Sequence, residues 1–281
     1  MIVAGFILLA VGAADLVRQF APRRWIGYLV VVVALLLLGS VSDALLPMAA
    51  SLVVGALWVW SMPDDRRAPL GFWPAVLLGV LAVGAVVWFG ARQDAGLIGE
   101  VWTLRSPFGE VSFDLAMLVL GVGVFLLESA NLVVRAALDG EHTWRPADPV
   151  TETVVVTTAE VETSAEPVTT AEAVITADGT EVASSDAGAE EATSSLSDPR
   201  AGFKGGRLIG PLERMLVLIL TLAAAYPILA AMLAAKGIVR FPEISRDGET
   251  GARAEYFLVG SLVSWVMALG SAFLVWWAAH S

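Results

Sequence analysis

Cysteine is absent from this chain of 281 residues, and histidine and lysine each occur only twice. Without cysteine the chain can form no disulfide, no thiolate nucleophile and no cysteine-ligated metal or iron–sulfur site. The two histidines, His142 and His280, lie far apart in the sequence, which excludes a centre with several histidine ligands within one subunit. We therefore expect neither a metal nor a cofactor.

The local motifs of common enzyme classes are missing as well. The sequence contains no paired-acid motif, nucleophile elbow, H-E-x-x-H metal motif or glycine-rich phosphate loop. It also has no basic stripe long enough to follow a nucleic acid backbone. The sequence thus predicts a protein that is not an enzyme and does not bind nucleic acid.

What the chain has in excess is apolar residues, which make up 57% of it and give a mean hydropathy of +0.75. They are gathered into blocks, which is typical of membrane spans of ~20 residues rather than of a soluble core. We therefore predict an all-α integral membrane protein with about seven transmembrane helices. The bias toward Ala, Val, Gly, Leu and Arg favours a bacterial source and hence the cytoplasmic (inner) membrane. The expected spans are residues 2–17, 25–41, 44–62, 72–91, 112–138, 211–235 and 254–279.

Tryptophans lie near the ends of these segments, as expected for the aromatic belts at the two membrane surfaces. Trp265 is the exception, because it falls well inside the last segment. The tryptophans assigned to the belts are Trp25, Trp58, Trp60, Trp73, Trp88, Trp276 and Trp277.

The net charge of −11 comes from one segment. Twelve acidic residues and no basic residue lie between Arg145 and Arg200, and the remaining chain is close to neutral. This Thr-, Glu- and Ala-rich stretch has too few apolar residues to offset the entropy of ordering it, so we expect a disordered linker over residues 140–207. It separates a five-helix region, residues 1–139, from a two-helix hairpin, residues 208–281.

Arginine and lysine counts predict the orientation. With the N-terminus outside and seven spans, eleven basic residues fall in the cytoplasm and six outside. This places the linker and the C-terminus inside the cell. Four of the six basic residues left outside belong to a single connection, residues 236–253, which fits the rule poorly.

The polar residues at membrane depth mark candidate sites, because an ionisable group is costly there. Glu128 and Asn131 are three residues apart and Asn131 and Arg135 four apart, so all three share one helix face in residues 112–138. This face is either a polar site for a proton, ion or solute or a stripe satisfied by a neighbouring helix. Elsewhere, Asp15 and Arg18 are expected to form an ion pair that reaches toward the membrane surface, and Asp114 to cap a helix.

The last two segments carry the clearest pattern. Pro227 lies in the middle of residues 211–235, where it is expected to kink the helix and to free a carbonyl near Ala223. Small residues recur on both segments and predict that the two helices pack closely against each other. They are Ala230, Ala231, Ala234 and Ala235 on the first and Gly260, Ser264 and Ala268 on the second.

Charged residues gather at the connection between these two segments. Lys236 and Glu255 lie near facing helix ends and are predicted to pair as a structural clamp. Alternatively, Lys236 and Arg240 form a site for an anion or a lipid headgroup.

This C-terminal part resembles a region shared by uncharacterised bacterial polytopic membrane proteins, with the pattern G-R-x-I-G-x-L-E-R, A-A-K-S-I-x-R-F and A-E-Y-x-x-x-G-T. The matching runs lie within residues 206–261, and Gly237 and Ser261 stand where Ser and Thr are usual. No activity is known for the family, so the resemblance implies a functional unit without naming its role. Its members here are Arg207, Glu213, Arg214, Lys236, Arg240 and Glu255.

Three functions compete. The first is a non-enzymatic protein that organises or regulates partners through its cytoplasmic linker, where phosphorylation of Thr158, Thr163 or Thr170 would create a site for a phosphothreonine-binding module. The linker is otherwise an inert spacer, and the partners are the bilayer and another membrane protein. The second is a small transporter or channel with its pathway at Glu128 and Asn131, or at Lys236 and Glu255. The third, an enzyme, has no motif in its favour.

Overall fold

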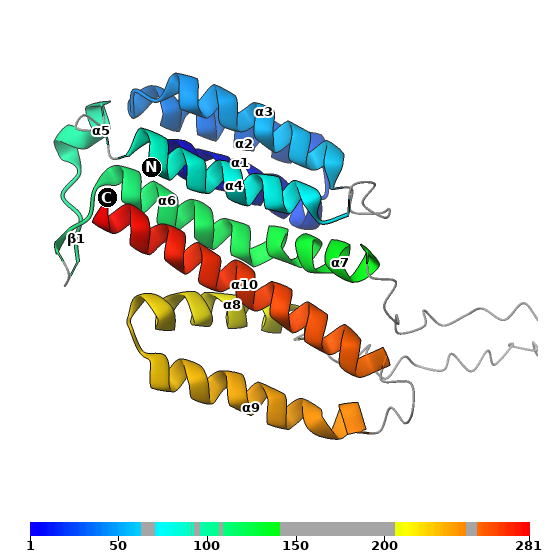
Figure 1. The fold of residues 1–281 in the computed structure, drawn as a ribbon. Coiled ribbons are helices and arrows are strands. Elements are labelled where there is room, and N and C mark those ends of the chain that lie inside the picture. The colour runs from blue at the N-terminus through cyan, green and yellow to red at the C-terminus, as the bar shows by residue number, and fades with distance from the viewer. Residues whose placement is uncertain (63–70, 91, 93–95, 107–108, 141–205, 246–251) are drawn as a thin grey trace, which may run out of the picture. The chain divides into compact units, whose positions relative to one another are not determined.

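The computed structural model describes residues 1–62, 71–90, 92, 96–106, 109–140, 206–245 and 252–281, and this part of the chain is mostly helical (Figure 1). Of the predicted linker, residues 140–207, residues 141–205 with Thr158, Thr163 and Thr170 lie outside the described residues, whereas Gly140 ends one helix and Gly206 and Arg207 begin the next. The elements are α1 (Ile2–Phe20), α2 (Arg24–Val41), α3 (Leu45–Ser61), α4 (Trp73–Phe89), α5 (Gly96–Val101), β1 (Arg105–Ser106), β2 (Gly109–Glu110), α6 (Phe113–Val124), the π-helical turn η1 (Phe125–Ser129), α7 (Ala130–Gly140), α8 (Gly206–Leu222), α9 (Tyr226–Ser245) and α10 (Ala252–His280).

Among the described residues, four helices are long and apolar enough to cross a membrane, so the predicted helical class is confirmed and the helices are compatible with a membrane protein. They cover Ile2–Phe20, Arg24–Val41, Phe113–Leu138 and Phe257–His280. Shorter apolar helices cover Leu45–Ser61, Trp73–Phe89 and Tyr226–Val239. The strands β1 and β2 form a small antiparallel ribbon between α5 and α6.

Helix α1 is the centre of the N-terminal bundle, with α2, α3, α4, α6 and η1 packed around it (Figure 1). Phe6 and Val11 of α1 and Leu118 and Leu126 of α6 and η1 are fully buried in this core. Helix α2 differs from its neighbours, because Leu35 and Gly39 are its only fully buried residues and most of its apolar side chains face outward. An outward-facing apolar helix is the pattern expected of a surface that meets lipid.

Three glycines allow α1 and α6 to approach each other closely. A Cβ atom on Gly5 would lie 2.9 Å from backbone atoms of Met117 and Leu118, and one on Gly12 would lie 2.8 Å from backbone atoms of Val124 and Phe125. On the other helix, a Cβ on Gly121 would lie 2.5 Å from the carbonyl oxygen of Gly5. Small residues at a helix interface give membrane bundles this kind of backbone contact, which replaces the hydrophobic driving force available in water.

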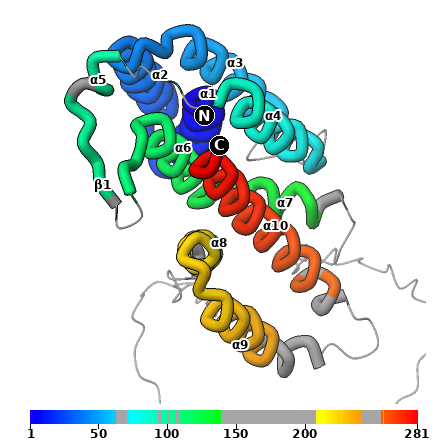
Figure 2. The backbone as a smooth tube through the Cα atoms, turned by 60° about the vertical axis from the view of Figure 1, so that its left-hand side comes forward, coloured from blue at the N-terminus to red at the C-terminus, as the bar shows by residue number. Residues whose placement is uncertain are grey.

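The predicted sixth span, residues 211–235, is wrong. Helix α8 ends at Leu222, a turn follows in which Ala224 has φ +53°, and α9 begins at Tyr226. Pro227 therefore lies in the first turn of α9, where its missing N–H leaves no helical hydrogen bond unmade, instead of kinking a continuous helix. The chain turns back at residues 223–225, so α8 and α9 form an antiparallel hairpin (Figures 1 and 2).

The small residues of this region also pack differently from the prediction. Ala230, Ala231, Ala234 and Ala235 of α9 are exposed, so they do not form the predicted face against α10. Ser264 and Ala268 of α10 are buried, with Ala268 in a cluster with Val217 of α8 and Leu229 of α9. Gly260 faces Val134 and Leu138 of α7. Helix α10 is thus held mainly by α8 and α7, and α9 lies at the edge.

The additional turn places the two termini of the chain at the same end of the helices (Figures 1 and 2). The C-terminal end of α7 and the beginning of α8, which flank the acidic linker, lie at the opposite end (Figure 1). This differs from the seven-span prediction, in which the termini lie on opposite sides.

We predict that Gly12→Ala lowers the free energy of unfolding by about 1–3 kcal/mol, because the new methyl group forces α1 and α6 apart. Thermal unfolding of the purified protein in detergent measures this effect. Gly84→Ala is the matched control, since nothing lies within 4 Å of its added Cβ and alanine is the better helix former. Equal melting temperatures for the two variants would contradict the glycine contact.

Candidate functional site

Asp15 lies at the centre of a buried hydrogen-bond network although it is part of an apolar helix. Asp15 is 1% exposed, and its side chain accepts hydrogen bonds from its own helix, α1, and from two other elements, α3 and η1. Arg18 Nη1 donates to Oδ1 over 3.2 Å, while Trp58 Nε1 (2.8 Å) and the Ser129 hydroxyl (2.5 Å) donate to Oδ2. Both carboxylate oxygens are thereby satisfied, as a charge buried away from water requires.

Arg18 completes this network at the end of α3. Its Nη1 also donates to the carbonyl of Met62 over 2.7 Å, and its Nη2 donates to the carbonyl of Val59. The last carbonyls of a helix have no partner within the helix, so they are natural acceptors for a guanidinium. The predicted Asp15–Arg18 pair exists, and Arg18 is buried at 9% exposure. Trp58, assigned from the sequence to an aromatic belt, is likewise buried.

The π-helical turn η1 changes which residue faces Asp15. Gly5 lies against Met117 and Leu118 and Gly12 against Val124 and Phe125, so α1 and α6 run in parallel with a constant offset. This offset would place Asp15 opposite Leu127 or Glu128. The extra residue that a π turn inserts brings the Ser129 hydroxyl there instead, so Asp15 receives a donor at this position, and the Glu128 carboxylate remains close enough to interact with it.

The same turn creates an acceptor for Arg214 of α8. The N–H of Ala130 bonds to the carbonyl of Phe125, five residues earlier, and so leaves the Leu126 carbonyl outside the usual four-residue pattern. Arg214 Nε donates to this carbonyl over 3.1 Å. Its Nη2 donates to Oδ1 of Asn131, and its side chain is only 2% exposed.

Arg214 is the partner of the polar face predicted at Glu128, Asn131 and Arg135. Asn131 Nδ2 lies 3.4 Å from Oε2 of Glu128, and the Glu128 carboxylate is close enough to attract the Arg214 guanidinium. Glu128 is buried, whereas the Arg135 side chain is exposed. Glu128 and Asn131 of the predicted intramembrane face thus lie together with one residue of the C-terminal signature, Arg214. We call Asp15, Arg18, Glu128, Asn131 and Arg214, with Trp58 and Ser129, the buried array.

A second polar cluster ties α9 to α8 and α10. Lys236 Nζ donates to both carboxylate oxygens of Glu213 over 2.7 Å, and Trp265 Nε1 donates to Oε1 over 3.0 Å. The ammonium group also lies 5.5 Å from the ring centre of Trp265 and 5.8 Å from that of Phe257, within range of cation–π attraction. Lys236 therefore pairs with Glu213, and the predicted pairing with Glu255, which is exposed, is wrong. The side chains of Arg207 and Arg240 lie outside the described residues.

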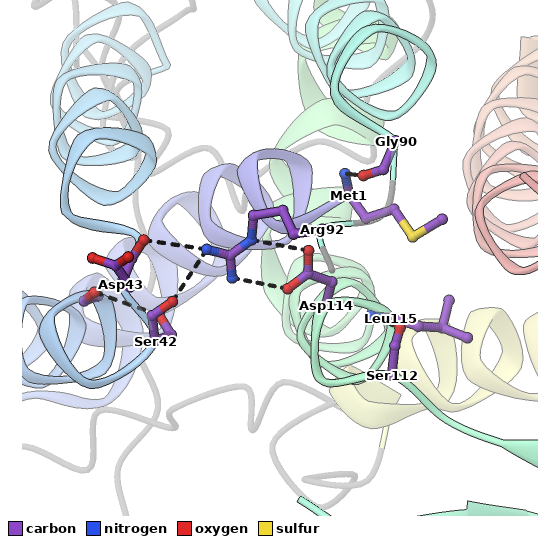
Figure 3. A network of polar contacts seen from close by, with 9 residues as sticks. Met1, Ser42, Asp43, Gly90, Arg92, Ser112, Asp114 and Leu115 are labelled. Atoms are coloured by element: carbon purple, nitrogen blue, oxygen red, sulfur yellow. Dashed lines mark hydrogen bonds and ion pairs between the residues drawn. The ribbon is translucent and has the colours of Figure 1, made fainter. Parts of the chain in front are cut away.

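A third cluster lies at the end of the bundle that carries the termini (Figure 3). Arg92 contacts both carboxylate oxygens of Asp114 over 3.2 and 3.0 Å and donates to the carbonyls of Ser42 and Asp43 over 3.1 and 3.2 Å. Asp114 was expected to cap a helix, but the cap of α6 is Ser112, whose hydroxyl accepts from the N–H of Leu115 over 3.2 Å. In the same view the Met1 amino group donates to the carbonyl of Gly90 over 2.6 Å.

A polar cavity of about 1040 Å³ adjoins this cluster, and Trp102, Arg92 and Asp114 are among the residues lining it. The Trp102 indole N–H already donates to the carbonyl of Val111 over 2.8 Å, and the ring packs edge-on against Phe113. The guanidinium and the carboxylate at the cavity wall are likewise engaged with each other.

The described residues contain no group of three or more histidine, cysteine, aspartate or glutamate side chains able to hold a metal ion. Comparisons with protein families, with curated proteins and with solved structures find no match for this chain. The role of the clusters must therefore be argued from their own chemistry: opposite charges are held together, fully buried at Asp15 and Arg18 and partly exposed at the Lys236–Glu213 and Arg92–Asp114 pairs.

We predict that Asp15→Asn lowers the free energy of unfolding by about 3–5 kcal/mol, because Arg18 is left buried without its counter-charge. Arg18→Gln should cost a similar amount, and the double variant should cost clearly less than the sum of the two, since the second change removes a charge that is already unpaired. Chemical unfolding in detergent micelles gives all three values. Arg105→Gln is the control, because its pair with Glu110 is solvent-exposed and contributes little. Strict additivity of the two single variants would show that Asp15 and Arg18 do not depend on each other.

Proposed function

We propose that this chain is a non-enzymatic membrane protein that organises or regulates partner proteins through its acidic linker, residues 141–205. The observation that carries the proposal is that both helices flanking the linker are fixed to the same buried array. Asn131 of α7 and the carbonyl of Leu126 just before it both bind Arg214 of α8. The linker therefore connects two helices, α7 and α8, that are hydrogen-bonded to each other through Arg214.

The state of the buried charges also favours a frame over a transport pathway. A pathway for a proton or ion needs polar groups that exchange partners during transport. In the buried array, Asp15 accepts three hydrogen bonds and the guanidinium groups of Arg18 and Arg214 are bound to carbonyl and amide oxygens of the protein. Such a network stabilises one arrangement of α1, α3, α6, α7 and α8, which is what a protein that presents a segment to partners requires.

The α8–α9 hairpin improves the agreement with the positive-inside rule. Because α8 and α9 run in opposite directions, the connection at 236–253 moves to the same end of the helices as the linker. Fifteen of the seventeen basic residues then belong to this end, and only Arg92 and Arg105 to the other. We propose that the linker end faces the cytoplasm of a bacterial cell and that both termini lie outside.

This orientation predicts that a short epitope tag after Ser281 is digested by protease added to intact spheroplasts. In inverted membrane vesicles the same tag should be protected, while protease should cleave the chain within the linker. A tag inserted in residues 236–253 should behave like the linker. A C-terminal tag that is cleaved only in inverted vesicles would restore the seven-span arrangement and contradict the proposed hairpin crossing.

Deletion of residues 146–199 tests the role of the linker. We predict that proteins cross-linked to the full-length chain in the native membrane are lost from the deletion variant, while its melting temperature changes little because the buried array is intact. Quantitative mass spectrometry of the cross-linked material makes the comparison. Thr158, Thr163 and Thr170 replaced together by Ala report separately whether a phosphothreonine-binding module is among the partners.

Two results would contradict the proposal. The first is an unchanged set of cross-linked partners after the deletion, which would make the linker a spacer. The second is a proton or ion flux in proteoliposomes that the wild type supports and Glu128→Gln abolishes, which would favour the transporter hypothesis.

A further inference from the structure

A second feature of the fold, independent of the linker, is an apolar groove of about 300 Å³ between α1, α2 and α3. Ala10 and Ala14 of α1 and Gly55 and Ala56 of α3 line one side of it. These side chains are too small to fill the space, and the valines and leucines of α2 form the opposite wall. Tyr28 carries the one polar side-chain group among the residues that line the groove.

The contents of the groove follow from its surroundings. It is open along the apolar surface of helices long enough to cross a membrane, so hydrocarbon, not water, is the medium in contact with it. An apolar cavity is not filled by water and accepts apolar molecules instead. The occupant that a bilayer supplies is an acyl chain.

The mouth of the groove carries unpaired positive charge. Ala14, Tyr28 and Val59 belong to the groove end that lies near the start of α2, and this helix begins with Arg23 and Arg24. Both guanidinium groups are exposed, and neither has an ion-pair or hydrogen-bond partner among the described residues.

Exposed aromatic side chains place the same end at the membrane surface. Phe20, at the end of α1, and Trp25, in the first turn of α2, are 66% and 68% exposed. Aromatic rings of this kind concentrate at the level of the lipid headgroups. Arg23 and Arg24 therefore lie at the depth of lipid phosphates, beyond the end of the groove that Tyr28 lines.

We propose that the groove between α1, α2 and α3 binds one acyl chain of an anionic phospholipid, whose phosphate is held by Arg23 and Arg24. The apolar walls bind the chain without regard to headgroup, and the two arginines select for negative charge. The arginine-rich linker end is also the end assigned above to the cytoplasmic leaflet, where anionic lipids are found.

Native mass spectrometry tests this proposal on the full-length protein reconstituted in nanodiscs of equal parts phosphatidylglycerol and phosphatidylcholine. The wild type should retain one lipid through extraction, with about a tenfold or greater preference for phosphatidylglycerol, as expected from two surface arginines. Arg23→Gln with Arg24→Gln should reduce this preference to the ratio in the nanodisc. Arg105→Gln, which removes an exposed arginine elsewhere, should leave it unchanged.

A second pair of variants tests the groove itself. Ala56→Phe fills the groove from an exposed position and should abolish the retained lipid, whereas Ala50→Phe, exposed on the same helix but outside the groove, should not. Circular dichroism confirms that both variants fold. Glycerol phosphate, the headgroup fragment without acyl chains, should not raise the melting temperature of the wild type, whereas phosphatidylglycerol should. Equal retention of the two lipids by the wild type, or undiminished retention by Ala56→Phe, would overturn the proposal.

Discussion

Two carboxylates and two guanidinium groups, those of Asp15, Glu128, Arg18 and Arg214, share the apolar interior of this bundle. Water does not reach them, so each must be neutralised and hydrogen-bonded by the protein itself. The partners come from α3, from the π-helical turn and from α8, and each bond therefore fixes the position of one helix against another. The apolar contacts fill the space between the helices, but the charges determine which helices are neighbours.

The π-helical turn shows how closely the backbone follows this requirement. A regular helix through Phe125–Ser129 would place Leu127 or Glu128, and not the Ser129 hydroxyl, opposite Asp15 and would leave Arg214 without the Leu126 carbonyl. One inserted residue removes both problems, because it supplies a hydroxyl on one side and a free acceptor on the other. A π turn has poorer hydrogen-bond geometry than an α-helix, and the bonds to Asp15 on one face and to Arg214 on the other offset this cost.

The sequence is sufficient to predict the helical membrane class and the shared face of Glu128 and Asn131, because helical spacing and hydrophobic blocks are local properties. It is not sufficient to identify Arg214 as their partner, since 83 residues separate Arg214 from Asn131. The hairpin between α8 and α9 was missed for another reason, because a proline kinks a helix interior but fits equally well in a first turn. The charge distribution nevertheless pointed to the hairpin. The seven-span arrangement places four basic residues of one connection on the outer side, where basic residues are disfavoured, and one additional crossing moves them to the cytoplasmic side.

The pairing of α1 with α6 has a consequence for biogenesis. Asp15 is separated from Ser129 by 114 residues, so α1 is synthesised long before its main neighbour exists. At the usual rate of translation this delay is on the order of ten seconds. During that time α3 can supply Trp58 and its last carbonyls to Asp15 and Arg18, but the Ser129 hydroxyl is missing and the glycine surface of α1 has no helix to meet. Synthesis of the first helix and completion of its packing are therefore separate events.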